Sequence, residues 1–168
     1  VYDLGASSSL RVAYANAFIA PTPGERSLRI PLLAPIDLSP FEAFCSAEGV
    51  SCGFDTPVPV LGVGNPVLDV EESETWELGW RGRLAEGVHV NVELYYSTLE
   101  SFFTEPLSVN DPVLGSYHPD YGPYAPPDEL SPETSAALVG TLEASLPPEV
   151  FAALTNEGPA TPLFALSY

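Results

Sequence analysis

Six polar side chains occupy alternate positions in stretches of the chain that otherwise read as β-strands: Arg11, Glu77, Arg81, Arg83, His89 and Glu93. A histidine and a glutamate can act together as an acid–base pair or as metal ligands. Here His89 and Glu93 share one face of a strand but lie roughly 13 Å apart, too far to hold one ion. We expect them instead to pair with Arg81 or Arg83 across a hairpin.

The chain lacks the motifs of the common catalytic sites. It contains no Gly-x-Ser-x-Gly nucleophile elbow, no pair of histidines at metal-binding spacing and no phosphate-cradling glycine loop. We therefore expect that the protein is not an enzyme.

Cys45 and Cys52 are the only cysteines of the chain. A metal site would need more ligands, and neither histidine lies near them in the sequence. A disulfide, worth about 2 kcal/mol through loop closure, is therefore the better interpretation for an exported protein. Two unrelated buried thiols are the alternative.

Acidic residues cluster in the stretch NPVLDVEESETW. Carboxylate oxygens are the ligands that calcium prefers, so a candidate calcium site consists of Asp69, Glu71 and Glu72. A solvated acidic loop is the alternative. Calcium is the one cofactor that the sequence suggests.

Three tyrosines lie close together in the stretch SYHPDYGPYAPP: Tyr117, Tyr121 and Tyr124. Their rings could form a stacking surface that binds a sugar or an aromatic chelate. Local packing within a proline-rich loop is the alternative.

The net charge excludes one class of partner. The chain carries 23 acidic residues against 5 basic ones, all arginine, which gives a formal charge of −18. Such a charge repels a phosphate backbone, so we expect no nucleic acid partner.

Proline divides the chain into regular and irregular parts. All 19 prolines fall within residues 21–66 and 106–162. Because proline removes a backbone donor, it is rare inside sheets and common in loops. We therefore expect long loops at 21–73 and 104–162, and strands at about 9–20, 74–84, 88–103 and 163–168.

Both loops also contain helix start signals. A capping box of Ser39 and Glu42 predicts one short helix, which Gly49 would end. Ser131 predicts a second helix and Pro148 a third, since serine caps helices and proline is favoured in their first turn.

The strand regions before residue 104 alternate apolar and polar residues with period two, which indicates one apolar face. The link Ala85-Glu86-Gly87 is short, so we expect one antiparallel hairpin with Trp80 and Val92 on the same face. Strands of about 9–11 residues can cross a bilayer when tilted, and short turns combined with long loops are typical of outer-membrane barrels. The sequence thus predicts a mainly β chain: antiparallel strands forming part of a transmembrane β-barrel, with long extracellular loops that contain short helices. An antiparallel sandwich is the alternative.

Two longer stretches carry a family resemblance. One is NPVLDVEESETWELGWRGRL with the following VHVNVELYYSTLESFF, and the other is AYANAFIAPTPGE. Both resemble the barrel of TonB-dependent outer-membrane receptors, over roughly residues 9–25 and 65–105. The chain departs from the family pattern at Ile19, where arginine is frequent, and at Val70, where proline is frequent.

The resemblance implies a ligand-gated transporter in the outer membrane of a Gram-negative-type bacterium, for a nutrient such as a metal chelate or an oligosaccharide. Its partners would be outer-membrane lipid, the transported small-molecule ligand, and a TonB complex contacted through parts not in this chain. Four strands cannot close a barrel and no plug domain is visible, so we expect a fragment of the barrel domain. The alternative is a secreted, acidic, β-rich binding or adhesion module.

The resemblance also implies which side of the barrel wall the six polar residues face. We expect the barrel lumen to be faced by Arg11, Glu77, Arg81, Arg83, His89 and Glu93. Loop 21–73 carries eight acids against two arginines, net −6, and loop 104–162 carries nine acids and no arginine, net −9. A vestibule made of these loops would concentrate cations and disfavour bare anions. A surface that is acidic only for solubility is the alternative.

Overall fold

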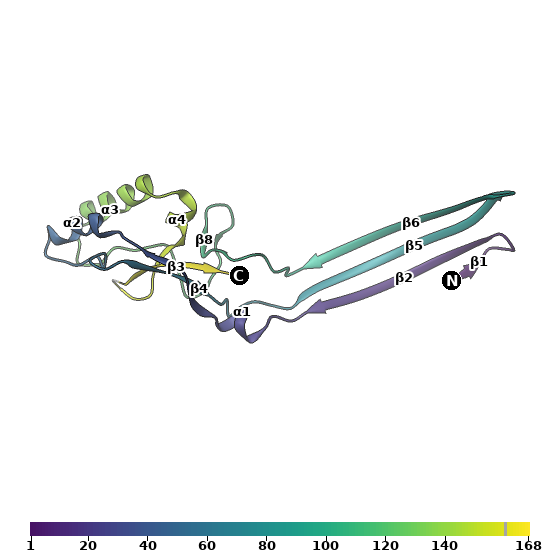
Figure 1. Cartoon of the computed structure of the whole chain (residues 1–168), viewed down its shortest axis with the longest axis horizontal. Helices are drawn as coiled ribbons and strands as arrows, with labels where there is room; N and C mark the ends of the chain where they lie inside the picture. Colours follow the sequence, from purple (N-terminus) through teal and green to yellow (C-terminus); the bar gives the residue numbers. More distant parts are fainter. Residues whose placement is uncertain (160) are drawn as a thin grey trace. The chain divides into compact units, whose positions relative to one another are not determined.

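The computed structural model describes residues 1–159 and 161–168. The chain forms two compact units, each built from two separate stretches (Figure 1). We call residues 1–21 with 69–103 the sheet unit, and residues 22–68 with 104–168 the loop unit. Each unit has its own β-sheet.

The sheet unit is antiparallel, with strand order β1-β2-β5-β6. Its strands are β1 (Tyr2–Asp3), β2 (Ser8–Ile19), β5 (Glu71–Ala85) and β6 (Val88–Glu100). Three of the expected strands lie here, but β5 begins earlier than the sequence indicated. Glu71 and Glu72, expected in a loop, pair with Ile19 and Phe18 of β2.

The predicted hairpin between β5 and β6 is confirmed. The two strands are joined by Glu86 and Gly87, and Gly87 supplies the positive φ of 77° that two-residue turns favour. Trp80 lies directly opposite Val92, as the matching phase of the two strands requires. The register shifts once, just after Arg83, so the turn end of the hairpin carries a bulge.

One face of the sheet unit is apolar. Strand pairing sets its side chains in three rows: Leu10 with Trp80 and Val92, Val12 with Leu78 and Leu94, and Tyr14 with Trp76 and Tyr96. The ring centroids of Tyr14 and Trp76 are 4.7 Å apart. Large side chains on this face are nevertheless uncovered, with Trp76 53% and Leu94 61% exposed. Within the described residues, this face has no protein partner.

The loop unit contains a sheet of order β10-β11-β4-β3, with the short β7 also paired to β11. Only the pair of β11 and β4 is parallel. A separate two-stranded hairpin joins β8 (Asn110–Asp111) and β9 (Gly115–Ser116). The strands of the larger sheet are β3 (Arg29–Ile36), β4 (Val58–Val63), β7 (Leu107–Ser108), β10 (Leu154–Asn156) and β11 (Pro162–Ser167).

The prediction for the C-terminal strand is wrong. Residues 163–168 were expected to form a fourth barrel strand, but β11 belongs to the loop unit and pairs in parallel with β4. Leu163, Phe164 and Ala165 are successive and all buried. Such a continuous apolar run is typical of a strand covered on both faces, whereas a barrel strand alternates.

The expected loops 21–73 and 104–162 are also more regular than the sequence indicated. Each contributes strands to the loop-unit sheet. The sequence did not predict β3 as a strand, because Pro31 and Pro35 lie inside it. β3 tolerates them because it is an edge strand whose register shifts twice.

The capping box expected at Ser39 and Glu42 is not formed. The segment consists of the short helices η1 (Ser39–Phe41) and α2 (Glu42–Ser46), neither of which has a side-chain cap. The Glu42 carboxylate instead accepts hydrogen bonds from the backbone N–H groups of Cys52 and Phe54, at 2.9 and 2.8 Å. This glutamate therefore fixes the chain that follows the helix rather than the helix start.

A capping box occurs instead at α1 (Pro23–Ser27). The Glu25 N–H donates to the Thr22 hydroxyl at 3.2 Å, and the Thr22 N–H donates to the Glu25 carboxylate at 2.6 Å. Both partners thus satisfy donors that a helix start leaves free.

The two helices expected in the second loop are present as α3 (Pro132–Ser145) and α4 (Pro148–Ala153). Ser131 caps α3 by accepting a hydrogen bond from the Thr134 N–H at 3.3 Å. Leu138 and Leu142 of α3 are fully buried. Among the described residues, no helix has the length and apolar character needed to cross a membrane.

Both stretches of the loop unit contribute to its larger hydrophobic core. Residues 22–68 contribute Leu38, Phe54 and Val60 among others, and residues 104–168 contribute Leu138 and Phe164. Cys45 and Cys52, also in this core, are joined by a disulfide with Cα atoms 5.7 Å apart. The two stretches therefore stabilise each other.

Replacing Cys45 and Cys52 together by alanine should lower the free energy of unfolding of the loop unit by about 2 kcal/mol, because the unfolded chain then loses a closed loop. Near-UV circular dichroism during denaturant unfolding of the full-length protein measures this change. The reduced wild-type protein keeps both buried sulfur atoms, so its loss of stability measures the loop-closure part alone and should be smaller than that of the alanine variant. Two free thiols titrated in the unreduced, denatured chain would contradict the disulfide.

Candidate functional site

The second face of the sheet unit is polar, and it is the candidate site. Residues of β2, β5 and β6 that face away from the apolar rows include all six polar residues singled out from the sequence. Pairing sets Arg11 opposite Gly79 and Gly79 opposite Glu93. It also sets Arg81 opposite Asn91, and Arg83 opposite His89. Strand alternation therefore brings the six side chains to one face.

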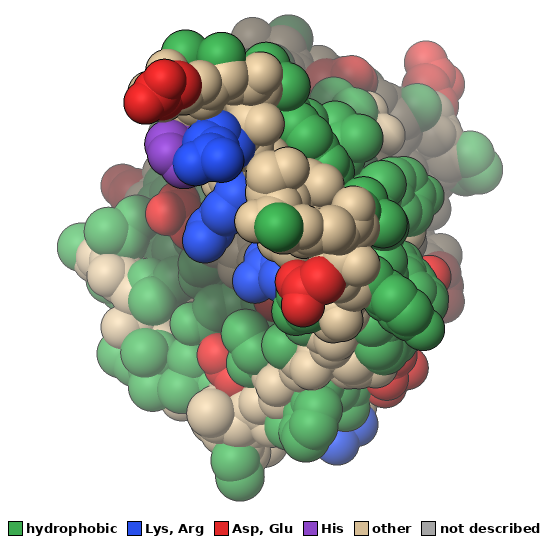
Figure 2. Space-filling model, turned by 90° about the vertical axis from the view of Figure 1, so that its right-hand side faces the viewer, with side chains coloured by type: hydrophobic (Ala, Val, Ile, Leu, Met, Phe, Trp, Pro, Cys, Tyr) green, Lys and Arg blue, Asp and Glu red, His purple; other side chains and the backbone are tan. Residues whose placement is uncertain are grey.

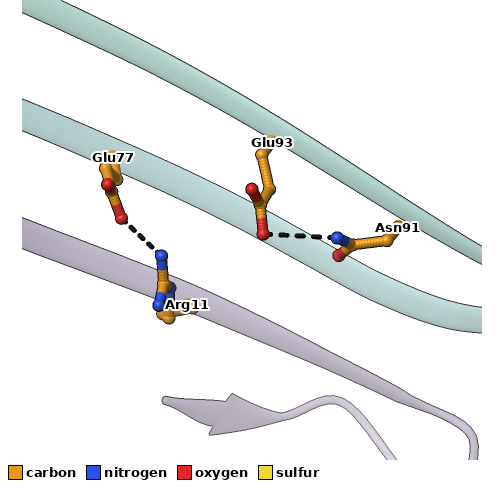
Figure 3. Close-up of polar contacts among 4 residues, drawn as sticks. All are labelled: Arg11, Glu77, Asn91 and Glu93. Atoms are coloured by element: carbon orange, nitrogen blue, oxygen red, sulfur yellow. Dashed lines mark hydrogen bonds and ion pairs between the residues drawn. The ribbon is translucent and has the colours of Figure 1, made fainter.

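An ion pair crosses the centre of this polar face. The Arg11 guanidinium donates to the Glu77 carboxylate between β2 and β5 (Figure 3). Both side chains are about half exposed, 51% and 43%, so water screens the pair and its contribution to stability is small. Gly79 lies opposite Arg11, and a Cβ at this position would make only an ordinary van der Waals contact with the Arg11 Cβ, at 3.7 Å.

The expected pairing of Glu93 with Arg81 or Arg83 is not formed. Glu93 instead accepts a hydrogen bond from the Asn91 side-chain amide at 3.2 Å, along the same strand (Figure 3). His89 lies opposite Arg83 but makes no ion pair within the described residues. The register places Glu93 opposite Gly79, two residues from Arg81, which explains the difference.

A cationic cluster therefore forms at the turn end of the polar face, consisting of Arg81, Arg83 and His89. Neither arginine has a carboxylate partner in the described part of the chain. These three residues, with Asp3 and Ser7, line an open depression of about 320 Å³. Figure 2 shows a histidine and basic side chains gathered beside one another. Such a cluster can attract an anionic group.

The three candidate tyrosines do not form a common stacking surface. Tyr124 is buried, and its ring centroid lies 5.5 Å from that of Phe54. The Tyr117 hydroxyl donates to the backbone carbonyl of Ser167 at 3.2 Å. Tyr117 and Tyr121 are both partly exposed, and the ring centroid of Tyr121 lies 4.8 Å from that of His118. Local packing explains their position better than a shared stacking role.

Burial raises the pKa of two of these tyrosines. Loss of solvent and the nearby Asp111 carboxylate raise the pKa of Tyr117 to about 12. Burial and the nearby Glu42 carboxylate also raise the pKa of Tyr124. A tyrosine hydroxyl is already protonated at neutral pH, and these shifts keep both hydroxyls protonated to higher pH.

The acidic residues proposed for calcium do not converge. Glu71 and Glu72 are consecutive in β5, so their side chains point to opposite faces of the sheet. The Glu71 carboxylate accepts a hydrogen bond from the Phe103 N–H at 3.0 Å, and that of Asp69 accepts one from the Val70 N–H at 2.8 Å. Across residues 1–159 and 161–168, no three histidine, cysteine or acidic side chains form a metal-binding group.

Two structural roles were missed by sequence reasoning. The Glu48 carboxylate accepts hydrogen bonds from Thr134 and Ser131, which lowers the pKa of Glu48 and ties it to the start of α3. Asn110 lines an apolar pocket together with Tyr124. No motif marks either residue, since each acts on a segment distant in the sequence.

Comparison with known proteins gives one match. The family model described as "TonB dependent receptor-like, beta-barrel" matches residues 1–136. No curated protein and no solved structure is significantly similar to the chain.

Substituting Tyr117 and Tyr124 separately by phenylalanine should distinguish the contributions of the two hydroxyls to the free energy of unfolding. Tyr117→Phe removes the hydrogen bond to Ser167 and should cost about 1 kcal/mol of stability, whereas Tyr124→Phe removes a hydroxyl with no partner among the described residues and should cost nothing. Denaturant unfolding at pH 7 measures both. Equal losses in the two variants would contradict this assignment.

Proposed function

Because the chain belongs to the family of TonB-dependent receptor-like β-barrels, whose members are outer-membrane transporters, we propose that it supplies part of a barrel wall and of the extracellular loops of such a receptor. The transported ligand is a nutrient such as a metal chelate or an oligosaccharide. TonB acts on the receptor through parts not in this chain.

The exposed apolar face of the sheet unit carries this proposal. Its rows run across three strands of 12 to 15 residues, long enough to cross a bilayer when tilted. The row of Tyr14, Trp76 and Tyr96 corresponds to the aromatic girdle of outer-membrane barrels, with the apolar rows between it and the hairpin turn. A secreted module would bury such a face, because exposed apolar area costs about 25 cal/mol per Å² in water. Lipid covers it without that cost.

Chain connectivity supports one orientation of the strands in the membrane. β2 ends at Ile19 and β5 begins at Glu71, so residues 22–68 leave and return at one end of the sheet. Residues 104–168 follow the end of β6 on that same side, since β6 is antiparallel to β5. The opposite end has only the turn at Glu86 and Gly87. Outer-membrane barrels have short periplasmic turns and long extracellular loops, so the loop unit is extracellular.

The polar face then faces the lumen. Small residues, Ala13, Ala15 and Ala17, alternate along β2 with the apolar row and leave space beside the charged residues of β5 and β6. The Arg11–Glu77 pair lies in the middle of this wall, and the cationic cluster lies near its periplasmic end. Water and ligand would contact these groups rather than hydrocarbon.

The loop unit would give the entrance a strongly negative potential. It contains fourteen acidic residues against Arg26 and Arg29, a net charge of −12. Such a field raises the local concentration of cations and lowers that of anions. The ligand that approaches is therefore neutral, cationic or carried by a metal.

The two faces can be distinguished by arginine at neighbouring positions of β6. Leu94→Arg places a charge on the apolar face and should destabilise the folded receptor by about 1–2 kcal/mol, because it would face lipid between the aromatic row and the bilayer midplane. Tyr95→Arg, on the polar face opposite Glu77, should leave stability almost unchanged. Urea unfolding of the full-length receptor in lipid vesicles measures both. Equal tolerance of the two substitutions, or the reverse order, would exclude a lipid-facing Leu94.

The field of the loop unit can be measured without the ligand. A fluorophore on Val113→Cys, an 89% exposed position of the loop unit, should be quenched more by caesium than by iodide at low salt. Changing Asp128, Glu129, Glu133 and Glu149 to Asn or Gln should reduce that preference, and so should about 1 M salt. Exchanging Asp and Glu at these four positions is the matched control, which keeps the charge. No preference at low salt would contradict a negative vestibule.

A further inference from the structure

Arg81 and Arg83 differ from the other arginines of the chain. The other three each have an acceptor, which is the carboxylate of Glu77 or Glu157 or the backbone carbonyl of Pro66. The guanidinium groups of Arg81 and Arg83 make no hydrogen bond or ion pair within the described residues. Carboxylates are abundant, since the chain has 23 acidic residues. The positive charge of these two arginines is therefore available to a ligand.

Strand pairing also places this charge close together. Arg83 lies directly opposite His89, and Arg81 lies two residues away on the same face, about 7 Å along β5. All three side chains are exposed. Like charges at this spacing repel one another, and the histidine adds to the repulsion whenever it is protonated. An anion bound between them would relieve this repulsion.

The cluster lines the open depression of about 320 Å³ at the turn end of the polar face. Residues between Asp3 and Ser9 form the rest of its wall. Ser9 is paired with Arg81 in the register of β2 and β5, and the Arg83 N–H donates to the backbone carbonyl of Ser7. Serine residues therefore line the wall beside both arginines.

These donors define the chemical class of the ligand. A guanidinium offers a planar fork of N–H donors that matches the oxygens of a carboxylate or a phosphate. A carboxylate has two oxygens, whereas a terminal phosphate has three acceptor oxygens and a charge near −2, so phosphate can accept from both arginines and a hydroxyl at once. The volume lies at the lower end of the range for small-molecule sites, so a phosphate carried by a small organic molecule also fits.

One carboxylate in the wall opposes an anion. Asp3 lines the same depression and forms no ion pair with either arginine. The lining thus contains two arginines against one aspartate, a net charge of +1 with His89 neutral. Asp3 weakens the attraction of an anion without reversing it. Removing its charge should therefore strengthen binding, whereas removing an arginine should weaken it.

We propose that this depression binds a terminal phosphate group, which Arg81 and Arg83 hold and to which Ser9 donates. Inorganic phosphate or a small phosphomonoester supplies that group. The inference rests on the proposed function in one respect, since it requires a polar face that is open to water. In the orientation proposed above, the turn end of β5 faces the periplasm, and the phosphate reaches the depression from that side.

Inorganic phosphate, glycerol phosphate, sulfate and acetate test this site on the full-length receptor in a neutral detergent. Titrations followed by phosphorus NMR line widths at about 0.15 M salt should show saturable binding of both phosphates. Sulfate should displace inorganic phosphate at least about five-fold better than acetate, because it shares the shape and charge of phosphate. Tighter binding of glycerol phosphate than of inorganic phosphate would identify an ester as the ligand, and equal binding would identify free phosphate.

Single substitutions in the depression should shift the affinity for inorganic phosphate in opposite directions. Arg81→Gln and Arg83→Gln should each weaken binding about five-fold, because each removes a charge-assisted pair. Asp3→Asn should strengthen binding about two-fold, because it removes a like charge. A gain in affinity cannot come from a misfolded protein, so Asp3→Asn decides even where an arginine variant fails to fold.

Arg26→Gln is the matched control, because it also removes an arginine without a carboxylate partner among the described residues, but from the loop unit. It should bind phosphate like the wild type. The proposal is wrong if phosphate does not saturate the wild type, if Arg26→Gln and Arg81→Gln weaken binding equally, or if Asp3→Asn leaves it unchanged.

The barrel wall is tested separately by Leu94→Arg. Phosphate binding together with a fully tolerated Leu94→Arg would contradict only the lipid-facing wall. A destabilising Leu94→Arg without phosphate binding would contradict only this site.

Discussion

The register of β5 is the constraint on which the sheet unit depends. β5 is hydrogen-bonded along both edges, to β2 from Glu71 to Gly82 and to β6 from Glu72 to Ala85. Because side chains alternate with period two, this pairing decides which residues share a face, and a slip of one residue would exchange the two faces. The aromatic row, the Arg11–Glu77 pair and the cationic cluster all follow from it. The two-residue turn at Glu86 and Gly87 fixes the register at one end.

The loop unit depends on a different kind of constraint, since two stretches separated by the hairpin must fold together. The parallel pairing of β11 with β4 joins them through backbone hydrogen bonds, and their apolar side chains form one core. Polar ties add to this: Glu48 of the first stretch holds the start of α3 in the second, and Arg29 pairs with Glu157. Loops of this length would otherwise lose much conformational entropy on ordering. Here a shared core offsets that cost.

The sequence predicted the elements whose signals are local. Period-two alternation identified the three long strands and the hairpin, and Ser131 identified the start of α3. It did not predict β3 or β4, because Pro31, Pro35 and Pro59 interrupt their pattern, or the role of β11, because parallel pairing leaves no local signal. Site residues show the same division. The six polar residues lie on the face that alternation assigns, whereas the pairing of Arg11 with Glu77, the burial of Tyr124 and the position of Asn110 arise from contacts between segments distant in the sequence.

Charge and burial act on a ligand at different distances in the loop unit. Its net charge of −12 acts over a Debye length of about 8 Å at physiological salt, so it influences which molecules approach but does not fix their orientation. The apolar pocket lined by Asn110 and Tyr124 acts only on contact, through its walls. The field therefore selects among approaching molecules by charge before any contact is made, whereas the walls of the loop unit select by shape only afterwards.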